Sequence, residues 1–334
     1  MSSYVRLGNS GLKVSRLWLG TMMFGLRTQQ DEAARIVDAA REAGLNALDT
    51  ADTYANGASE TMLGGLIRKD RSRWVLATKV FNRMGAEPNM AGLSRRWILE
   101  ECDHSLRRLG TDWIDLYYLH KDDYDTPLEE TVAAIGDLIR AGKIRYFGLS
   151  NFRAWRMARV AELCDRMGVP RPIAVQPPYS AVTRGIEVEV LPCAAAYGMG
   201  PVVYSPLARG VLTGKYRAGE APEPETRAAR KDERLMQTEF RPESFAIAET
   251  LRAHAEATGR TAVDFAIGWV LANRLVNGVI AGPRTLAQWQ AYMHAASSPF
   301  SAEDEALVDS LVHPGHASTH FYTDPQYPVT GRQN

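Results

Sequence analysis

The chain has 334 residues, of which 45% are hydrophobic, enough for a large core in one domain or two. Its 39 lysines and arginines balance 39 acidic residues, and this zero net charge argues against binding to nucleic acids or anionic membranes. No apolar run approaches the ~18 residues of a transmembrane helix, and the first residues lack the apolar core of a signal peptide. We therefore expect a cytoplasmic protein that binds neither nucleic acid nor membrane.

The predicted elements alternate between helix and strand. Apolar residues recur at helical spacing over residues 31–43, and the short apolar segment 46–49 follows as a strand. Further helices are predicted over residues 59–68, 93–110, 126–142, 154–168, 186–198, 242–259, 262–273 and 285–296. The other predicted strands cover residues 16–21, 73–79, 114–120, 145–150, 173–176, 201–205 and 278–282.

Capping residues mark where some of these helices begin and end. Gly44 can end the first helix in a left-handed conformation, and Ser94 can cap the start of the helix over residues 93–110. Thr126, Pro127 and Glu129 have the spacing of a capping box with a proline in the first turn.

Eight short strands that alternate with helices favour a parallel sheet. Because these strands are too apolar for an open edge, we predict a closed (β/α)8 TIM barrel, an α/β fold, as a single domain over residues 1–334. The Gly-Asn-Ser-Gly turn within residues 4–15 predicts a β-hairpin at the bottom of the barrel. Extra helices and loops are expected at the C-terminal side, with a long loop over residues 216–240 and an irregular tail over residues 313–334.

The segment ALDTADTY, residues 47–54, places polar groups directly after a buried strand. Asp49 ends the second predicted strand and Tyr54 follows in its loop, while Lys79 and His120 end the third and fourth strands. The C-terminal ends of barrel strands meet at one mouth, so these side chains are expected together there. Each alone has an ordinary structural explanation, such as a helix cap, a solvated charge or a packing contact. Four at neighbouring strand ends indicate an active site.

These four groups suit proton transfer coupled to attack on a carbonyl. Tyrosine has an unperturbed pKa of about 10, and the ammonium of Lys79 would lower it by favouring phenolate. Asp49 can hold Lys79 in place, and His120 can hydrogen-bond the carbonyl oxygen and polarise it. None of these residues is a good hydride source, so a cofactor must supply one.

The chain resembles the aldo-keto reductase superfamily over about residues 4–295. The matching segments lie at the strand ends and read LDTADTYANGASETMLG, ATKV, LYYLH, GLSNF, VQPPYS, VVYSPLARGVLTGKY and IAGPRTLAQ. The segment YSPLARGVLTGKY is similar to the subgroup that includes potassium-channel β-subunits and bacterial aldehyde reductases. This resemblance implies an enzyme that uses NADPH to reduce aldehydes, and ketones as well, with nucleotide bound first. It makes Tyr54 the acid of a catalytic tetrad with Asp49, Lys79 and His120.

The same resemblance implies where NADPH (NADP+) would bind. The nicotinamide carboxamide would be held by Ser150, Asn151 and Gln176. Tyr204 would stack on the ring, and the floor beneath it would be lined by Thr21 and Met22. Asp49 would also contact the cofactor. The pyrophosphate would lie along Ser205, Pro206, Leu207, Ala208 and Arg209, together with Lys215.

The adenosine end would be held by Gly282, Arg284 and Gln288. The guanidinium of Arg284 suits a 2′-phosphate because it can meet the phosphate with two parallel hydrogen bonds. The family often follows this glutamine with a Glu-Asn pair that contacts adenine. Here those positions are Ala291 and Tyr292, so the contacts to adenine must differ.

Other motifs are weaker. No G-x-G-x-x-G opens a βαβ unit, and GVLTGKY fails the spacing of a phosphate-binding loop. The tail contains three histidines, at 313, 316 and 320. No carboxylate or thiol stands at a metal-binding spacing from them, so we expect no metal site. The acids Asp122, Asp123 and Asp125 are interpreted as solvated loop charges, with contact to substrate at the barrel mouth as the alternative. The three cysteines, Cys102, Cys164 and Cys193, are interpreted as reduced, non-catalytic thiols on helices.

Two other functions remain open at this point. A nicotinamide-nucleotide sensor or channel-type accessory subunit could keep all four reactive residues with little turnover. A non-redox barrel enzyme, such as an isomerase or lyase, does not account for GLSNF, YSPLARG and IAGPR together. The substrate would be selected by loops, where Phe24, Phe81 and Tyr124 suggest a partly apolar pocket.

The segment 216–240 is expected to close over bound nucleotide as a lid, with an inert surface insertion as the alternative. It contains Pro222 and Pro224, many charges and little apolar periodicity, so it has few means to pack by itself. Its basic residues, which could be drawn to phosphates, are Arg217, Arg227, Arg230 and Lys231.

Overall fold

The computed structural model describes residues 4–217, 220–329 and 331. The chain divides into two compact units. The barrel unit comprises Met1–Pro177, Glu189–Tyr204 and Arg274–Met293, and the second unit comprises Pro178–Val188, Ser205–Asn273 and His294–Asn334.

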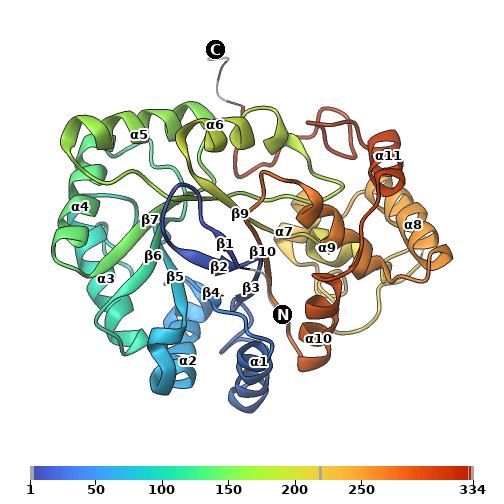
Figure 1. The fold of residues 1–334 in the computed structure, drawn as a ribbon, viewed down its shortest axis with the longest axis horizontal. Coiled ribbons are helices and arrows are strands. Elements are labelled where there is room, and N and C mark those ends of the chain that lie inside the picture. The colour runs from blue at the N-terminus through green and yellow to red at the C-terminus, as the bar shows by residue number, and fades with distance from the viewer. Residues whose placement is uncertain (1–3, 218–219, 330, 332–334) are drawn as a thin grey trace. The chain divides into compact units, whose positions relative to one another are not determined.

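The barrel unit contains a closed barrel of parallel strands in the order β10-β3-β4-β5-β6-β7-β8-β9 (Figure 1). Its strands are β3 (Leu17–Gly20), β4 (Ala47–Asp49), β5 (Val75–Val80), β6 (Ile114–Leu119), β7 (Ile144–Ser150), β8 (Ala174–Gln176), β9 (Gly200–Tyr204) and β10 (Gly278–Ala281). They are short and nearly all buried, as in barrels whose interior is filled with side chains. The predicted (β/α)8 TIM barrel is confirmed.

Helices alternate with these strands along the chain and surround them (Figure 1). They are α1 (Gln30–Glu42), α2 (Ala58–Ile67), α3 (Arg95–Leu109), α4 (Leu128–Arg140), α5 (Ala154–Met167), α6 (Val190–Tyr197) and α10 (Leu286–Ala295). Two 3₁₀ helices, η1 (Tyr54–Gly57) and η2 (Arg68–Arg73), flank α2. The predicted cap at Ser94 is confirmed, because its side chain accepts a hydrogen bond from the Trp97 amide.

The predicted N-terminal hairpin is also confirmed. Strands β1 (Tyr4–Arg6) and β2 (Lys13–Ser15) pair antiparallel. Leu7 and Val14 from this hairpin are buried in one apolar cluster with strand-start residues such as Ala47 and Val75. The hairpin therefore closes the N-terminal end of the barrel, which leaves the opposite end for reactive groups.

The second unit is helical. It contains η3 (Gly185–Glu187), η4 (Ala208–Thr213), α7 (Glu233–Thr238), α8 (Pro242–Ala257), α9 (Ala262–Ala272) and α11 (Ala302–Leu311). The sequence analysis did not predict α11, which begins with a capping box between Ser301 and Asp304. The predicted helix over residues 186–198 is instead two pieces, η3 and α6. The tail has no helix or strand in its described residues, 313–329 and 331.

The capping box expected at Thr126 is wrong. Helix α4 begins at Leu128 with Pro127 as its N-cap residue, and no side chain caps it. The Thr126 hydroxyl instead donates a hydrogen bond to the carboxylate of Asp123, 2.8 Å away. The sequence spacing was correct, but a nearer acceptor in the preceding loop holds the threonine.

The segment 216–240 is not an unstructured loop, although Ala218 and Gly219 within it lie outside the described residues. It contains α7, and Tyr216 and Leu235 are buried. Phe240 contacts the rings of Tyr216 and Phe245 edge to face. The segment therefore packs by its own aromatic and apolar side chains. Closure over a nucleotide stays a prediction.

Across the residues that the structure describes, no helix is both long and apolar enough to span a membrane. The longest helix, α8, carries charged residues throughout, with Glu243, Glu249, Arg252 and Glu256 among them.

A buried ionic cluster ties α2 and α3 to the barrel beside the Tyr54 segment. Glu60 on α2 accepts hydrogen bonds from Arg108 on α3 and from Thr78 on β5, both at 2.6 Å. Arg108 also pairs with Glu101 of its own helix. Both carboxylates are fully buried, and a buried ion pair is tolerated only when such hydrogen bonds satisfy it.

Asp52 is buried next to this cluster. Its Oδ1 accepts a hydrogen bond of 2.6 Å from the amide of Thr53, and its Oδ2 has no hydrogen-bond partner among the described residues. Burial raises the pKa of Asp52 well above its ordinary value, and the nearby carboxylates of Glu60 and Glu101 raise it further. Burial beside two carboxylates therefore favours the protonated form of Asp52.

Gly64 sets how closely α2 approaches α3. A Cβ atom at Gly64 would lie 2.3 Å from the backbone oxygen of Leu109. Gly64→Ala should therefore push the helices apart and lower the free energy of unfolding by about 1–3 kcal/mol. Gly65 on the same helix is the matched control, because its Cβ would have no neighbour within 4 Å. Gly65→Ala should be neutral or stabilise by up to about 1 kcal/mol. Urea unfolding of both variants checks this, and equal effects would contradict it.

The raised pKa of Asp52 predicts how stability changes with pH. Above the ordinary carboxyl pKa of about 4, the folded protein keeps a proton that the unfolded chain has released. Stability should then fall as pH rises, by about 1.4 kcal/mol per pH unit for one proton, until the folded pKa is passed. The asparagine of Asp52→Asn cannot titrate, so this variant should show a smaller change of unfolding free energy with pH. Asp38→Asn, on the exposed face of α1, is the control and should keep the wild-type slope.

Urea unfolding between about pH 5 and pH 8 measures these slopes. A wild-type slope retained in Asp52→Asn would mean that Asp52 is ionised in the folded protein.

Candidate active site

The four predicted reactive side chains meet at the C-terminal ends of three adjacent strands. Asp49 is the last residue of β4, Lys79 lies near the end of β5, and His120 directly follows β6. Parallel pairing brings these ends together, with Asp49 opposite Ala77 on β5 and the backbone amide of His120 bonded to the Val80 oxygen at 2.9 Å. The sequence expectation that strand order would assemble these groups is met by the geometry.

Tyr54 reaches the same place from η1. The two residues after it, Ala55 and Asn56, have φ angles of 49° and 52°, and Gly57 has a φ of 90°. A Cβ at Gly57 would lie 2.8 Å from the side chain of Arg108, so only glycine fits this close approach. This left-handed run turns the chain sharply and leaves the phenol facing the strand ends.

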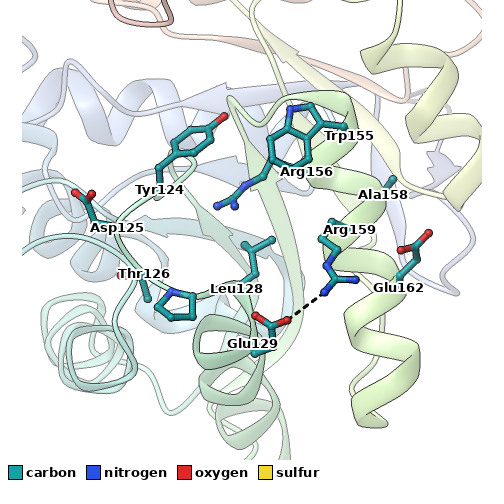
Figure 2. Close-up of a pocket in the computed structure, with 11 residues that line it drawn as sticks. Tyr124, Asp125, Thr126, Leu128, Glu129, Trp155, Arg156, Ala158, Arg159 and Glu162 are labelled. Atoms are coloured by element: carbon teal, nitrogen blue, oxygen red, sulfur yellow. Dashed lines mark hydrogen bonds and ion pairs between the residues drawn. The ribbon is translucent and has the colours of Figure 1, made fainter. Parts of the chain in front are cut away.

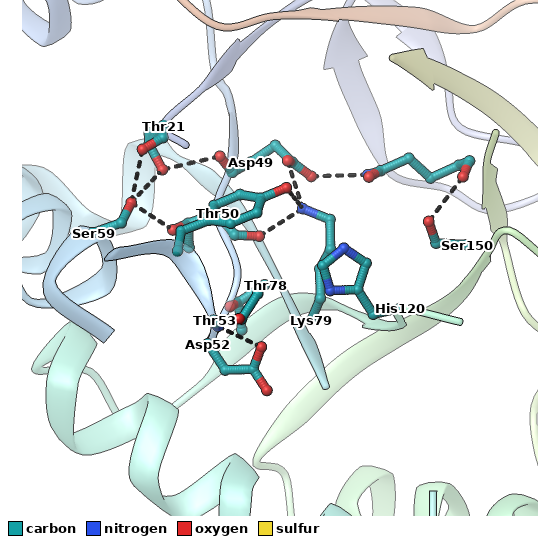
Figure 3. A network of polar contacts seen from close by, with 12 residues as sticks. Thr21, Asp49, Thr50, Asp52, Thr53, Ser59, Thr78, Lys79, His120 and Ser150 are labelled. Atoms are coloured by element: carbon teal, nitrogen blue, oxygen red, sulfur yellow. Dashed lines mark hydrogen bonds and ion pairs between the residues drawn. The ribbon is translucent and has the colours of Figure 1, made fainter. Parts of the chain in front are cut away.

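Lys79 is the centre of the arrangement (Figure 3). Its side chain is fully buried, and its Nζ lies 2.6 Å from Asp49 Oδ1 and 2.7 Å from the backbone oxygen of Thr50. Its third contact is the hydroxyl of Tyr54, at 3.3 Å. A buried ammonium with three oxygen partners is fully satisfied and points one of its hydrogens at the phenol.

Burial and charge oppose each other at this pair. Burial lowers the pKa of Lys79, but Asp49 and Tyr54 raise it more, so the pKa lies above its ordinary value. Burial raises the pKa of Tyr54 more than the ammonium of Lys79 lowers it. The expectation that Lys79 brings this pKa below its ordinary value is therefore wrong, and the reason is desolvation. Tyr54 keeps its proton at neutral pH.

His120 is neutral in this setting. Burial, and then the charges of Lys79 and Lys121, lower its pKa well below the ordinary value. Its ring packs edge to face against Tyr54, with 6.2 Å between ring centroids. Its Nδ1 lies 3.0 Å from the side-chain nitrogen of Asn82.

Three of the residues expected at the nicotinamide form a chain of hydrogen bonds. Gln176 Nε2 donates to Asp49 Oδ2 at 2.8 Å, and its backbone oxygen accepts from Ser150 Oγ at 2.8 Å. Asn151 donates to the His120 backbone oxygen and to Ser150 Oγ, both at 3.0 Å. Tyr204 donates to Asn151 Oδ1 at 2.8 Å. These side chains lie at the ends of β7, β8 and β9, and they offer both donors and acceptors.

Asn151 has a φ of 60°, which asparagine tolerates better than most residues. Its backbone amide bonds to the Gln176 oxygen at 3.3 Å, and its side chain reaches back to β6. The turn therefore aims one amide group at His120 and Tyr204 together.

The remaining cofactor candidates of the barrel unit lie on other strand ends. Thr21 is buried after β3, and its hydroxyl contacts the Asp49 backbone oxygen at 3.1 Å, while Met22 beside it is partly exposed. Gly282 is exposed after β10. Gln288 accepts a hydrogen bond of 2.8 Å from the Arg284 amide, and the Arg284 oxygen accepts from Thr28 at 2.9 Å.

The other candidates, Ser205, Pro206, Leu207, Ala208, Arg209 and Lys215, belong to the second unit. Ser205, Ala208 and Arg209 have φ angles of 60°, 47° and 53°. A Cβ at Gly210 would lie 2.7 Å from Lys215 Nζ, so the lysine folds back over this strip. Repeated left-handed residues turn successive backbone amides, an arrangement that suits anion binding.

The acids of the loop after β6 were expected to be solvated, but two of the three are held by protein groups. Asp122 is largely buried and accepts hydrogen bonds from Arg156 Nε at 2.9 and 3.0 Å. Asp123 accepts from the Leu93 amide at 2.7 Å and thereby holds the preceding loop. Asp125 is exposed, as expected.

Tyr124 lines a surface cavity of about 640 Å³ with Trp155 and Arg156 (Figure 2). The Arg156 guanidinium lies 4.7 Å from the Tyr124 ring centroid and 5.5 Å from that of Trp155. None of the four reactive side chains lines this cavity, and Phe24 is fully buried in the core. Of the aromatic residues expected at a substrate pocket, the partly exposed Phe81 lies nearest to the reactive groups in sequence.

The cysteines lie on helices, as predicted: Cys102 on α3, Cys164 on α5 and Cys193 on α6. All are free, and burial raises the pKa of the first two thiols to about 12. In the described part of the chain, no group of three His, Cys, Asp or Glu side chains is close enough to hold a metal ion.

No role was predicted from the sequence for two residues near the reactive groups, Asn82 and Asp52. Asp52 stands inside the quoted segment ALDTADTY, yet its side chain is buried away from water and was given no role. Asn82 lies three positions beyond Lys79, past the end of β5, and only its spatial closeness to His120 marks it. A single polar residue in a loop has no sequence signature that would indicate its contact with the active site.

Comparison with known proteins identifies the family of this chain. The model of the aldo/keto reductase family matches residues 16–313. A probable voltage-gated potassium channel subunit beta from Arabidopsis thaliana is 37% identical over 297 residues, which cover 87% of this chain and 90% of that protein.

Two further relatives have similar coverage. An uncharacterized oxidoreductase, YrpG, from Bacillus subtilis (strain 168) is 36% identical over 320 residues, 92% of this chain and 95% of that protein. A putative voltage-gated potassium channel subunit beta from Schizosaccharomyces pombe is 36% identical over 285 residues, 83% of each chain. This chain therefore belongs to the aldo/keto reductase family, and it is an NAD(P)H-dependent oxidoreductase.

Proposed function

We propose that this protein reduces aldehydes, and also ketones, to alcohols with NADPH, using Tyr54 as the general acid. The observation that carries the proposal is the contact of 3.3 Å between the Tyr54 hydroxyl and the buried ammonium of Lys79. A phenol that keeps its proton beside a fixed positive charge can release that proton when negative charge develops on a substrate oxygen.

The nucleotide supplies a hydride to the carbonyl carbon when it is bound. Tyr54 gives its proton to the carbonyl oxygen, so hydride and proton together convert C=O into an alcohol. Lys79 stabilises the phenolate that remains, and Asp49 holds Lys79 through the contact of 2.6 Å. His120, being neutral, donates a hydrogen bond to the same oxygen.

The residues present fit a nicotinamide carboxamide. Such a group needs both a donor and an acceptor, and the strand-end side chains of Ser150, Asn151 and Gln176 offer both. The bond of 2.8 Å from Tyr204 to Asn151 holds the Tyr204 ring in one orientation, which supports a stacking role. Thr21 and Met22 would line the floor beneath the ring.

The pyrophosphate contacts would come from residues 205–209 and Lys215. The left-handed residues of this strip support that role because turned backbone amides bind anions. Arg284 would meet the 2′-phosphate of NADPH, and Gln288 supports it by accepting a hydrogen bond from its backbone amide. Gly282 would leave room for the adenosine ribose.

A cytoplasmic location is part of the proposal. The described cysteines are free, and two of them are buried with a pKa of about 12, which makes them poor nucleophiles. Free, unreactive thiols suit a reducing compartment.

The second candidate function is a nicotinamide-nucleotide sensor or channel-type accessory subunit. It is favoured by two relatives that are named as potassium channel subunits beta. The discriminating experiment follows NADPH consumption with an aldehyde panel that includes 4-nitrobenzaldehyde and methylglyoxal. Multiple turnovers support the enzyme, whereas tight NADPH binding with no turnover supports the sensor.

Tyr54→Phe tests the acid. The ring stays and only the hydroxyl is lost, so carbonyl reduction should fall by about 10²–10⁴-fold while NADPH binding changes little. Turnover and a nucleotide fluorescence titration measure the two quantities. Tyr117→Phe is the matched control, because its buried hydroxyl has no hydrogen-bond partner among the described residues. A Tyr54→Phe variant with more than half of wild-type activity would remove Tyr54 from this role.

Arg284→Ala tests the preference for NADPH over NADH. Hydrogen bonds to a charged group contribute about 1.5–3 kcal/mol, so wild type should bind NADPH at least about 10-fold more tightly than NADH. Arg284→Ala should remove most of this ratio. Arg35→Ala, which removes an exposed guanidinium paired with Glu32, should keep it. An unchanged ratio in Arg284→Ala would move the phosphate site elsewhere, and equal wild-type constants would refute the preference.

A further inference from the structure

The side chain of Asn82 contacts the imidazole of His120 at its Nδ1 atom. The side-chain nitrogen of Asn82 and Nδ1 of His120 are 3.0 Å apart. Both residues extend from paired strands, since Val80 on β5 lies opposite Leu119 on β6. The backbone around Asn82 is also fixed, because the oxygen of Phe81 accepts a hydrogen bond of 2.7 Å from the Gly92 amide. The contact is therefore built into the strand ends.

This contact determines which ring nitrogen carries the proton. An amide nitrogen can only donate, so Nδ1 of His120 must accept with its lone pair. An imidazolium has a hydrogen on both nitrogens and would oppose Asn82. A neutral ring that accepts at Nδ1 has its single hydrogen on Nε2.

The surrounding charges favour the same neutral ring. Lys79 on β5 and Lys121 after β6 both face His120 and oppose a positive charge on it. Tyr54 packs edge to face on the ring without a charge, and Asp49 is occupied by Lys79 and Gln176. No carboxylate of the reactive group competes for a proton on the ring.

We propose that Asn82 is a positioning residue that fixes His120 as the tautomer with its hydrogen on Nε2, ready to donate to the carbonyl oxygen of the substrate. This proposal rests on the carbonyl reduction proposed above. Asn82 acts through His120 and touches no reacting atom. With the other tautomer, Nε2 would present a lone pair to the carbonyl oxygen, and two lone pairs would repel each other.

The test combines a spectroscopic and a kinetic measurement on the full chain. Nitrogen-15 NMR of histidine-labelled protein distinguishes the two neutral tautomers from each other and from imidazolium, and His120→Gln assigns the resonance. Wild type without nucleotide should show the Nε2–H tautomer at neutral pH. A wild-type ring with its hydrogen on Nδ1, or with equal populations, would overturn the proposal.

Asn82→Asp reverses the contact, because a carboxylate can only accept. The His120 ring should then place a hydrogen on Nδ1, and its pKa should rise. At a pH above that pKa, kcat for aldehyde reduction should fall on the order of 10²-fold, the usual cost of one lost oxyanion donor. Activity should recover as pH falls, when the imidazolium regains a hydrogen on Nε2. KM should change much less than kcat.

Asn56→Asp is the matched control, because it adds the same charge to the exposed residue two positions after Tyr54. It should leave the nitrogen-15 pattern of His120 unchanged. Asn82→Leu should remove the preference between the tautomers and lower kcat less than Asn82→Asp does. An Asn82→Asp variant whose tautomer switches while kcat stays within threefold of wild type would refute the role in donation.

The outcomes separate this inference from the proposed function. If Tyr54→Phe retains activity, the proposed acid is wrong, yet the NMR measurement still decides whether Asn82 sets the tautomer. If Tyr54→Phe is inactive and Asn82→Asp leaves the tautomer unchanged, only the role of Asn82 fails.

Discussion

The buried ion pair between Lys79 and Asp49 is the constraint on which the site depends. The side chain of Lys79 is fully buried and that of Asp49 nearly so, and their charged atoms lie 2.6 Å apart. Removing two charges from water costs several kcal/mol per ion, so the pair persists only because other groups complete its hydrogen bonds. Thr50 provides an oxygen to Lys79, and Gln176 donates to the second oxygen of Asp49. Removing either charge would leave the other buried and uncompensated.

Burial and the fixed positive charge of Lys79 act together on the protonation of the neighbouring side chains. Burial, and then the charges of Lys79 and Lys121, hold the pKa of His120 well below its ordinary value, which favours a neutral ring with a single N–H. Burial raises the pKa of Tyr54 more than Lys79 lowers it, so the phenol keeps its proton until negative charge develops nearby. Lys79 thus lies beside a phenol that keeps its proton, and its ammonium would stabilise the phenolate that forms when the proton is transferred.

The sequence predicted the architecture well because its signals were local and repeated. Each barrel strand is a short apolar run between helices, and each reactive residue ends such a run, so strand order alone brought Asp49, Lys79 and His120 together. The roles of these residues, and the nucleotide contacts, stay predictions. The Ser94 cap was found, whereas the same kind of signal failed at Thr126 because Asp123 offered a nearer acceptor. Local patterns do not reveal such competition.

The other sequence predictions that failed did so because the residues concerned make contacts with distant parts of the chain. The segment 216–240 looks polar, but Tyr216, Leu235 and Phe240 are spaced too irregularly to show a period, and they pack only once the chain folds back. Asp122 was expected to be a solvated loop charge, yet it is largely buried and pairs with Arg156 from α5. Asn82 and Asp52 acquire their importance from neighbours many residues away. Contacts between residues so far apart in the chain leave no pattern in a single sequence.

The bond between Gln176 and Asp49 joins opposite sides of the barrel. Its partners sit on β8 and β4, four strands apart in a closed ring of eight, and 127 residues apart in sequence. The first half of the barrel carries Asp49, Lys79 and His120, and the ends of β7 and β8 in the second half contribute the uncharged side chains of Ser150, Asn151 and Gln176. Asp49 Oδ2 has its partner, Gln176, only when the ring of strands is closed, so the hydrogen bonding of the ion pair is completed by a residue from the far side of the barrel.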